Sequence, residues 1–339
     1  MDPGRGLMRQ IIDKARSNPK RLVLTDCHDD RVLKAATVLA REGIAHPVLI
    51  GHRESLERTA GRLGLSLDGI EVVDGASHPH FDDCVTELER LLARRGITRP
   101  QARSRLHSQT RLALMLLRLG HVDCCITGAT RSYADAMRPV LQIIGTEGRA
   151  AGVYIIMTRE RTLFFADTTA NIDPDAETLA EITLKVVERV RGFDMVPRVA
   201  MLSFANFGAV AHKDAVKMAR ATELVRARDP ELMIEGEIQV DLAVDMELRE
   251  RMFPWSRLTE AANVFIFPNL TAANIAYKMM HQLGGASIFG PILLGPRRPV
   301  HVLALNVDAN DIVNLGAWAV VSAQESTAIG HGVDLVIPE

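Results

Sequence analysis

The stretch RLVLTDCHDDRVLKAATVLAREG, residues 21–43, encodes a strand and a helix joined by a polar turn. Residues 21–26 form a short β-branched run that ends in polar side chains, which predicts a strand. Residues 29–43 then carry apolar side chains at helical spacing up to Gly43. The stretch is therefore one strand–helix unit, and the fold class depends on how often that unit recurs.

The same unit recurs through the first half of the sequence. The expected strands are HPVLIG, IEVVDG and HVDCCITGA, and the expected helices are an amphipathic N-terminal helix, ESLERTAGRLG and a long segment from His80 to Gly96. Strands that alternate with helices of roughly ten to fifteen residues favour a parallel sheet covered on both faces. The fold class is therefore α/β.

The pattern changes after Gly152. VYIIMT and TLFFAD, on either side of the turn-like RER, predict an antiparallel pair of strands. The alternation then resumes, with strands expected at PRVAMLSF, ANVFIFP, ASIFGPILLG and VHVLAL, and helices at 175–191, 211–226, 270–282 and DIVNLGAWAVVSAQES. No linker rich in Pro, Gly or Ser separates the halves, so we expect two closely packed domains with the ligand site in the cleft between them.

Composition excludes several classes of protein. The chain has 339 residues, 47% of them hydrophobic and 24% charged, which is typical of a folded globular protein. A formal net charge of −2 predicts no general attraction to nucleic acid or to an anionic membrane. Neither a signal peptide nor a membrane span is apparent, so a soluble, cytoplasmic protein is expected. The four cysteines show no CxxC spacing, which favours reduced core thiols over metal ligands or disulfides.

Polar clusters follow the expected strands, where loops at the carboxyl ends of a parallel sheet collect ligands. TDCHDDR, residues 25–31, suits either an anion or metal site or a helix N-cap with acidic residues near the helix dipole. TGATRSYADAMRP, residues 127–139, places Ser132 and backbone N–H groups at a helix mouth. Arg131 and Arg138 share a helical face there, and they either hold a phosphate or are solvated surface residues.

Two further clusters lie in the second half. In SFANFG, Ser203 and Asn206 are natural helix caps or anion donors. In FPNLTAANIAYK, Asn269 suits a helix cap, while Asn274 and Lys278 are able to face one groove. Taken alone, these asparagines are more commonly caps than ligands.

The motifs of several enzyme classes are absent. The sequence contains no GxGxxG, GxxxxGK[ST], GxSxG or HExxH, so dinucleotide binding, nucleotide hydrolysis, nucleophile-elbow hydrolysis and zinc proteolysis lose their usual support. His107, His121, His212, His281 and His301 form no metal-binding spacing. We therefore expect no metal site in this chain.

In combination the motifs resemble the phosphate acetyltransferase/butyryltransferase family. The shared segments, in order, are TDCHDDRVLKAA, HVDCCITGATRSYADAMRPVLQII, FADTTANIDPDAETLAEI, PRVAMLSFANFG, EGEIQVDLA, ANVFIFPNLTAANIAYK and GPILLG. The resemblance runs from about Pro19 to about Gln324. Within the family, TRSY, SFANFG, NLTAANIAYK and PVHVL followed by DIVNLGAWAVVSAQ look like the C-terminal phosphotransacetylase-like domain of bacterial hybrid malic enzymes.

The resemblance implies a domain arrangement and a chemistry. It implies two α/β/α domains, with the second (150–299) inserted into the first (1–149 plus 300–339), a cleft between them and a homodimer. In active members the thiolate of CoA attacks acetyl phosphate directly, without a metal in the chemical step. Such a reaction needs a base for the thiol, donors for the carbonyl oxygen and cations for the phosphate.

The segment PVHVLALNVDANDIV departs from the family at its last loop. Active members resemble P-[VI]-N-D-L-S-R-G there, followed by an aspartate that is the proposed base, and their Ser and Arg serve the carbonyl and the phosphate. Ala304 and Leu305 take the Ser and Arg positions in this chain, while Asp311 is retained. Loss of one oxyanion donor alone costs about a hundred- to a thousandfold in rate. No catalytic residue is therefore expected to work, and turnover should be very low or absent.

The retained family positions imply a receptor instead of a catalyst. The ligand-binding residues that we expect are Thr127, Arg131, Ser132, Arg138, Ser203, Asn274, Lys278 and Asp311. In hybrid malic enzymes the corresponding domain is a regulatory module: acetyl-CoA binds it and inhibits malate oxidation by the N-terminal malic-enzyme domain. Such linkage requires that acetyl-CoA bind the inhibited state more tightly.

The chain itself lacks a nicotinamide-binding fingerprint, so we do not expect it to oxidise malate. No cofactor is expected here, since NADP and a divalent metal belong to the malic-enzyme domain. The sequence resembles either a separately expressed C-terminal domain or a stand-alone relative. Two alternatives stay open: a working phosphate acyltransferase that draws donors from Arg131, Arg297 or Arg298, and a purely structural oligomerisation module.

Overall fold

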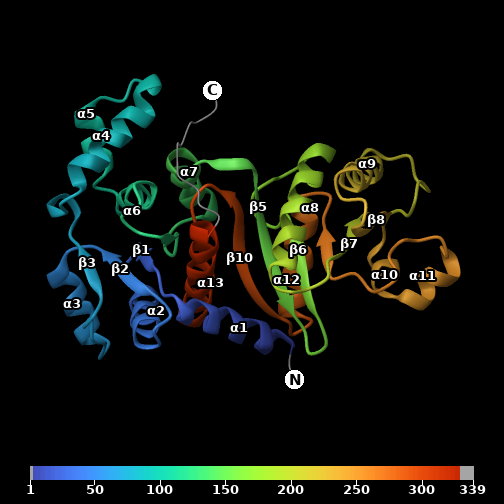
Figure 1. The fold of residues 1–339 in the computed structure, drawn as a ribbon, viewed down its shortest axis with the longest axis horizontal. Helices are drawn as coiled ribbons and strands as arrows, with labels where there is room; N and C mark the ends of the chain where they lie inside the picture. Colours follow the sequence, from blue (N-terminus) through green and yellow to red (C-terminus); the bar gives the residue numbers. More distant parts are fainter. Residues whose placement is uncertain (1–2, 329–339) are drawn as a thin grey trace. The chain divides into compact units, whose positions relative to one another are not determined.

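Two sheets organise residues 3–328, the part of the chain that this computed structural model describes (Figure 1). They belong to two compact units. One unit is formed mainly by residues 147–295. The other is discontinuous: it contains residues 8–146, and the chain returns to it at residue 296. The α/β class with parallel-rich sheets is confirmed.

The discontinuous unit has a five-stranded sheet in the order β11-β4-β1-β2-β3, with each adjacent pair parallel. Its strands are β1 (Arg21–Leu24), β2 (His46–Ile50), β3 (Glu71–Val73), β4 (Cys124–Thr127) and β11 (Val300–Val302). All four residues of β4 are buried. Burial of consecutive residues is what a parallel strand shows when elements cover both faces of its sheet.

The helices of this unit are α2 (Asp30–Arg41), α3 (Arg53–Arg62), α4 (Phe81–Leu92), α5 (Arg99–Arg105), α6 (Gln109–Arg118), α7 (Tyr133–Ile143) and α13 (Ala309–Ala328), together with helix α1 (Pro3–Ser17) from Met8 onward. Helix α13 packs against α2 and against strands β1 and β4. Gly316 permits this close approach, because a Cβ atom there would lie 3.0 Å from two methyl carbons of Leu39. The helix expected from His80 to Gly96 ends earlier, at Leu92, and continues as a 3₁₀ turn.

The unit of residues 147–295 has a six-stranded sheet in the order β10-β5-β6-β9-β7-β8. Its strands are β5 (Thr146–Met157), β6 (Thr162–Ala166), β7 (Arg198–Leu202), β8 (Met233–Ile238), β9 (Val264–Ile266) and β10 (Ser287–Pro296). Strands β5 and β6 pair antiparallel, as predicted, while β6–β9, β9–β7 and β7–β8 are parallel. The helices are α8 (Ala176–Arg191), α9 (Lys213–Arg228), α10 (Val240–Val244), α11 (Met246–Met252) and α12 (Leu270–Gln282).

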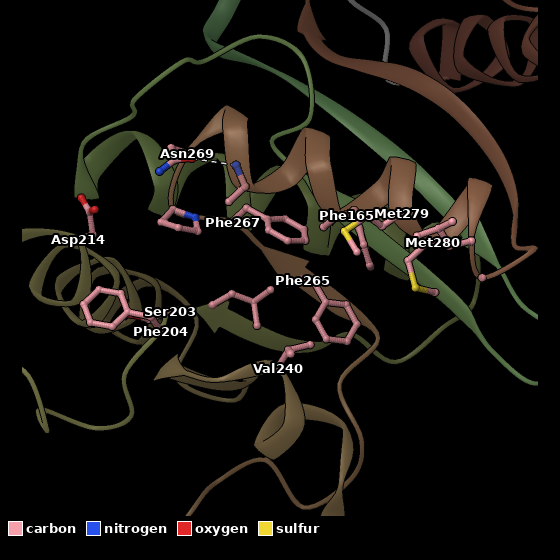
Figure 2. A pocket seen from close by; sticks show the side chains of 16 residues that line it. Phe165, Ser203, Phe204, Asp214, Val240, Phe265, Phe267, Asn269, Met279 and Met280 are labelled. Carbon is pink, nitrogen blue, oxygen red and sulfur yellow. Dashed lines mark hydrogen bonds between the residues drawn. The ribbon is translucent and has the colours of Figure 1, made fainter.

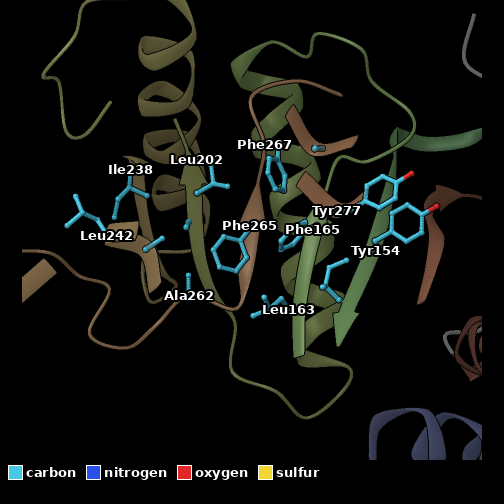
Figure 3. Packing of buried hydrophobic residues seen from close by; sticks show 14 of the residues in the cluster. Tyr154, Leu163, Phe165, Leu202, Ile238, Leu242, Ala262, Phe265, Phe267 and Tyr277 are labelled. Carbon is cyan, nitrogen blue, oxygen red and sulfur yellow. The ribbon is translucent and has the colours of Figure 1, made fainter. Parts of the chain in front are cut away.

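One face of this sheet carries an aromatic core (Figure 3). Phe165 on β6 lies between Phe265 and Phe267, with ring centroids 5.4 and 5.1 Å away. Helices α10 and α12 contribute Leu242 and Tyr277 to the same cluster. Side chains alternate between the faces of a strand, and Met201 contacts Thr183 on α8, so helix α8 covers the opposite face.

All four cysteines are buried and are not joined in disulfides. Burial raises the pKa of the Cys27 thiol and of the Cys84 thiol to about 12. In residues 3–328, moreover, every helix is too short or too polar to cross a membrane.

Candidate functional site

The carboxyl ends of β1 and β4 meet in a buried polar network within the discontinuous unit. The hydroxyl of Thr25 donates to that of Thr127 at 2.8 Å. The carboxylate of Asp26 accepts hydrogen bonds from the backbone N–H of Gly128 at 3.1 Å and from the hydroxyl of Thr130 at 2.7 Å. Asp26 is only 5% exposed, and its carboxylate is hydrogen-bonded to the loop after β4. These hydrogen bonds hold that loop in place.

The helix cap expected in TDCHDDR is present. Asp29 is the N-cap residue of α2, and its carboxylate accepts a hydrogen bond from the backbone N–H of Arg31 at 2.9 Å. The Arg31 guanidinium also forms a bidentate pair with Asp29, and this hydrogen bond lowers the pKa of the Asp29 carboxyl. The acids of this segment are therefore engaged in local structure.

Arg31 holds two loops at the end of the sheet, a role that sequence reasoning missed. Its guanidinium donates to the carbonyl oxygen of Ala129, in the loop after β4, at 3.0 Å. It also donates to the carbonyl oxygens of Leu305 at 2.9 Å and Val307 at 2.8 Å, in the loop after β11. No local sequence motif predicts this role, because the acceptors are backbone carbonyl oxygens of residues far away in the sequence.

Three arginines surround a pocket of about 420 Å³ beside this network. The pocket brings together the predicted residues Arg131, Ser132 and Arg138 and adds Arg111 from α6. Burial, reinforced by the charges of Arg105 and Arg131, lowers the pKa of the Arg111 guanidinium. Guanidinium groups gathered in this way favour a phosphate or another oxyanion, which relieves their mutual repulsion.

The predicted residues around this pocket have distinct positions. Ser132 is the N-cap of α7: it accepts from the N–H of Asp135 at 3.2 Å and donates to that carboxylate at 2.6 Å. Arg138 reaches the same carboxylate at 3.8 Å with its side chain 78% exposed. Thr127 is buried beneath the pocket and lies 3.4 Å from the hydroxyl of Thr110, which lines it.

The loop after β11 carries Ala304 and Leu305. It begins where the N–H of Leu303 donates to the carbonyl of Thr127 at 2.9 Å. Ala304 is partly buried, and Leu305 is 54% exposed. Neither side chain can donate a hydrogen bond or carry a positive charge. At Ala304 and Leu305, only backbone N–H groups are available to donate hydrogen bonds to an anion.

Asp311 lies in the first turn of α13 and forms a reciprocal cap with Asp308. The N–H of Asp311 donates to the Asp308 carboxylate at 2.8 Å, and the N–H of Asp308 donates to the Asp311 carboxylate at 2.9 Å. This pairing is the geometry of a capping box with aspartate in the place of glutamate. The carboxylate of Asp311 therefore has a structural use whether or not it also acts as a base.

The predicted residues Ser203, Asn274 and Lys278 belong to the unit of residues 147–295, where an apolar groove of about 860 Å³ opens (Figure 2). Ser203 follows β7 and lines one end of this groove together with Asn269, the N-cap of α12. Asn274 and Lys278 are on α12 but outside the groove lining. The Asn274 amide lies 3.4 Å from the hydroxyl of Tyr277, whose pKa is raised by burial.

Similarity to known proteins points to one family. Residues 6–320 match the family described as phosphate acetyl/butaryl transferase. The phosphate acetyltransferase of Bacillus subtilis is 36% identical over 314 residues, covering 91% of this chain and 96% of that protein. The phosphotransacetylase structure from Streptococcus pyogenes superimposes with a TM-score of 0.88 at 32% identity, covering 96% of this chain and 99% of that one.

Some relatives are much longer. The NADP-dependent malic enzyme of Escherichia coli is 38% identical over 325 residues, which are 94% of this chain but 43% of that enzyme. A phosphate acetyltransferase from Nitratidesulfovibrio vulgaris is likewise covered over only 45% of its length. The chain therefore spans less than half of the length of these relatives.

Proposed function

Because the chain belongs to the phosphate acetyl/butaryl transferase family, we propose that it binds acetyl-CoA without transferring the acetyl group. The observation that carries this proposal is the pair Ala304 and Leu305 in the loop after β11, where the resemblance implies a serine and an arginine. A tetrahedral transition state needs hydrogen-bond donors for its oxyanion, and side chains of these two types provide none.

The arginine pocket supports the binding half of the proposal. CoA carries several phosphate groups, and Arg111, Arg131 and Arg138 offer guanidinium forks that match phosphate oxygens. The N-terminus of α7 begins at the same pocket and adds a favourable dipole. Arg31 keeps the loops after β4 and β11 in place, so the pocket is preorganised before a ligand arrives.

The similarity to malic enzymes supports a regulatory role. We propose that in a malic enzyme this region follows an N-terminal catalytic domain and inhibits it when acetyl-CoA binds. Malic enzyme forms pyruvate, a source of acetyl-CoA, so such inhibition is feedback. By linkage, acetyl-CoA must bind the inhibited state more tightly, and malate turnover must fall as the site fills. Cytoplasmic action accords with four free, buried thiols.

We also propose that two copies associate through the apolar groove. Ile275 and Met279 of helix α12 and Leu283, its C-cap residue, lie at intervals of four residues, and they are 54%, 54% and 80% exposed. Phe204 and Val240 are similarly exposed at the opposite wall of the groove. The stripe of Ile275, Met279 and Leu283 forms a ridge beside the groove. In a dimer with a two-fold axis, the ridge of each copy is able to enter the groove of the other copy. Association would remove this surface from water.

An active phosphate acyltransferase is the second candidate, because three pocket arginines remain and the Bacillus subtilis relative bears that name over nearly its full length. The discriminating measurement is phosphate-dependent release of CoA thiol from acetyl-CoA. We expect background rates for the natural chain. We expect the double variant Ala304→Ser/Leu305→Arg to gain turnover of about a hundredfold or more. Robust turnover by the natural chain that Asp311→Asn abolishes would establish the second candidate.

A further inference from the structure

Two histidines and an aspartate come together in the discontinuous unit, away from the arginine pocket. His80 is the N-cap residue of α4, Asp83 lies in the first turn of that helix, and His121 lies shortly before β4. One ligand atom from each of the three side chains lies within 4.8 Å of the others. Zinc binds such atoms at about 2.0–2.1 Å, which sets neighbouring ligand atoms roughly 3.3 Å apart. A small adjustment of the side chains therefore closes the group around an ion.

The present geometry is open and adjustable. Nδ1 of His80 lies 3.3 Å from the Asp83 carboxylate, and the rings of His80 and His121 are stacked with centroids 3.8 Å apart. The side chains of His80 and Asp83 are 45% and 68% exposed, so an ion reaches them from solvent. Rotation of an imidazole about χ2 meets only a broad, shallow preference, so the rings are able to turn their lone pairs toward a common point.

A positive side chain close to the group is already engaged. Arg21 is paired with Glu71 at 2.7 Å, and it donates to the carbonyl oxygen of His121 at 2.6 Å. The charge of Glu71 therefore offsets that of Arg21 beside the histidines.

Two neighbouring residues, His78 and Cys84, are not expected to be ligands. His78 accepts a hydrogen bond at Nδ1 from the backbone N–H of His80, at 3.3 Å. This nitrogen is therefore used to stabilise the turn before α4. Cys84 is buried in the core, and it is not among the side chains whose ligand atoms come together. The set is therefore two nitrogen atoms and one carboxylate oxygen, with water free to complete the coordination.

We propose that His80, Asp83 and His121 form a binding site for a transition-metal dication of the zinc or nickel kind. Imidazole and carboxylate ligands suit these ions, whereas Ca²⁺ and Mg²⁺ prefer sites made entirely of oxygen. The bound ion would join the start of α4 to the segment before β4. It would stabilise the folded chain, because ligands held apart in the unfolded chain meet only in the fold.

The test is a calorimetric titration of the chelator-treated full chain with Zn²⁺ at neutral pH. We expect one saturable equivalent, a rise in melting temperature with Zn²⁺, and no such response to Ca²⁺. His121→Ala and Asp83→Asn should each weaken Zn²⁺ binding by roughly tenfold or more, because each removes a ligand. The matched control is His52→Ala, which removes an exposed histidine paired with Asp74 at 2.8 Å and should change nothing.

A visible spectrum with Co²⁺ in place of Zn²⁺ gives an independent reading, since coordinated imidazole alters the absorption of the ion. The spectrum should change at the same Co²⁺ concentration with the natural chain and with His52→Ala, whereas His121→Ala should need roughly tenfold more Co²⁺ or show no change. Absence of saturable Zn²⁺ binding would overturn the proposal. Equal binding by the natural chain and by both ligand variants, each shown to be folded by circular dichroism, would also overturn it.

Discussion

The guanidinium of Arg31 donates a hydrogen bond to the carbonyl oxygen of Leu305 at 2.9 Å, across the end of the parallel sheet. The same group also holds the carbonyl oxygens of Val307 and Ala129. The loop that carries Ala304 and Leu305 is thus fastened to the loop after β4, which carries Arg131. Under the proposed receptor function, this fastening keeps the pocket in shape for its ligand.

Replacement of Arg31 by alanine should therefore damage both the fold and ligand binding. Three carbonyl oxygens would lose a charged donor, which should lower the free energy of unfolding by about 1.5–3 kcal/mol. Urea denaturation measures this loss, and calorimetry should show weaker acetyl-CoA binding. The control is Arg41→Ala, whose side chain is 74% exposed and pairs with Glu42 at 3.4 Å. Its effect should stay within about 0.5 kcal/mol, so equal effects of the two changes would contradict the role assigned to Arg31.

Arg111→Ala should weaken acetyl-CoA binding by roughly tenfold or more, which corresponds to about 1.4 kcal/mol. Arg111 is the least exposed of the pocket arginines, so its charge is the least screened by solvent. Affinity should also fall as salt is raised, and the salt dependence should be smaller in the variant. Arg53→Ala, on the exposed side of α3, is the control. Unchanged affinity in Arg111→Ala would rule out the pocket as the phosphate site.

Leu283→Glu should convert a dimer into a monomer. Leu283 is 80% exposed on the groove wall, so a charge there leaves each fold intact but penalises burial at an interface. Light scattering coupled to size exclusion gives the molar mass. Ile172→Glu places the same charge on a residue that is 76% exposed and outside the groove lining, and it should leave the dimer unchanged. A natural chain that is monomeric, or a Leu283→Glu variant that stays dimeric, would refute the proposed interface.

The buried thiols predict a loss of stability in alkaline solution. The pKa of Cys27 and that of Cys84 rise from 9.0 to about 12 on folding, so the native state holds these protons more tightly than the unfolded state does. Their contribution is complete below pH 9.0 and is lost as the pH rises toward about 12. Urea midpoints at several alkaline pH values measure the loss. The variant Cys27→Ala/Cys84→Ala should show a shallower decline, and an identical decline would contradict this assignment.

The elements with the plainest periodicity were predictable from sequence alone. The strand–helix unit of residues 21–43 and the antiparallel pair β5 and β6 appear where their apolar patterns indicate. Helices α5 and α6 were not predicted. One reason is Arg118 of α6, a charged residue that is only 5% exposed because it pairs with Glu87 at 2.9 Å. A buried charge of this kind interrupts the pattern of apolar and polar side chains from which a helix is predicted. The short helices α10 and α11 likewise depend on packing in the aromatic core.

The difference between local sequence patterns and tertiary packing also decides which site residues could be predicted. Arg131, Ser132 and Arg138 are close in sequence, so their meeting at one pocket was predictable. The expectation that Arg131 and Arg138 share a helical face was wrong, because α7 begins at Tyr133, after Arg131. Arg111 and Arg31 reach the site through packing between distant segments, which no local motif encodes. His80 and His121 are likewise separated by the three helices α4, α5 and α6, so spacing rules for metal ligands could not pair them.

The central claim is that acetyl-CoA is bound and left intact, and one calorimetric experiment tests it. Acetyl-CoA is injected into the natural chain in phosphate buffer, and the heat is followed well beyond each injection. The predicted result is a saturable binding heat that returns to the baseline, with the acetyl thioester recovered whole. Absence of saturable heat would contradict binding, and a sustained heat flow with acetyl phosphate accumulating would contradict the loss of catalysis.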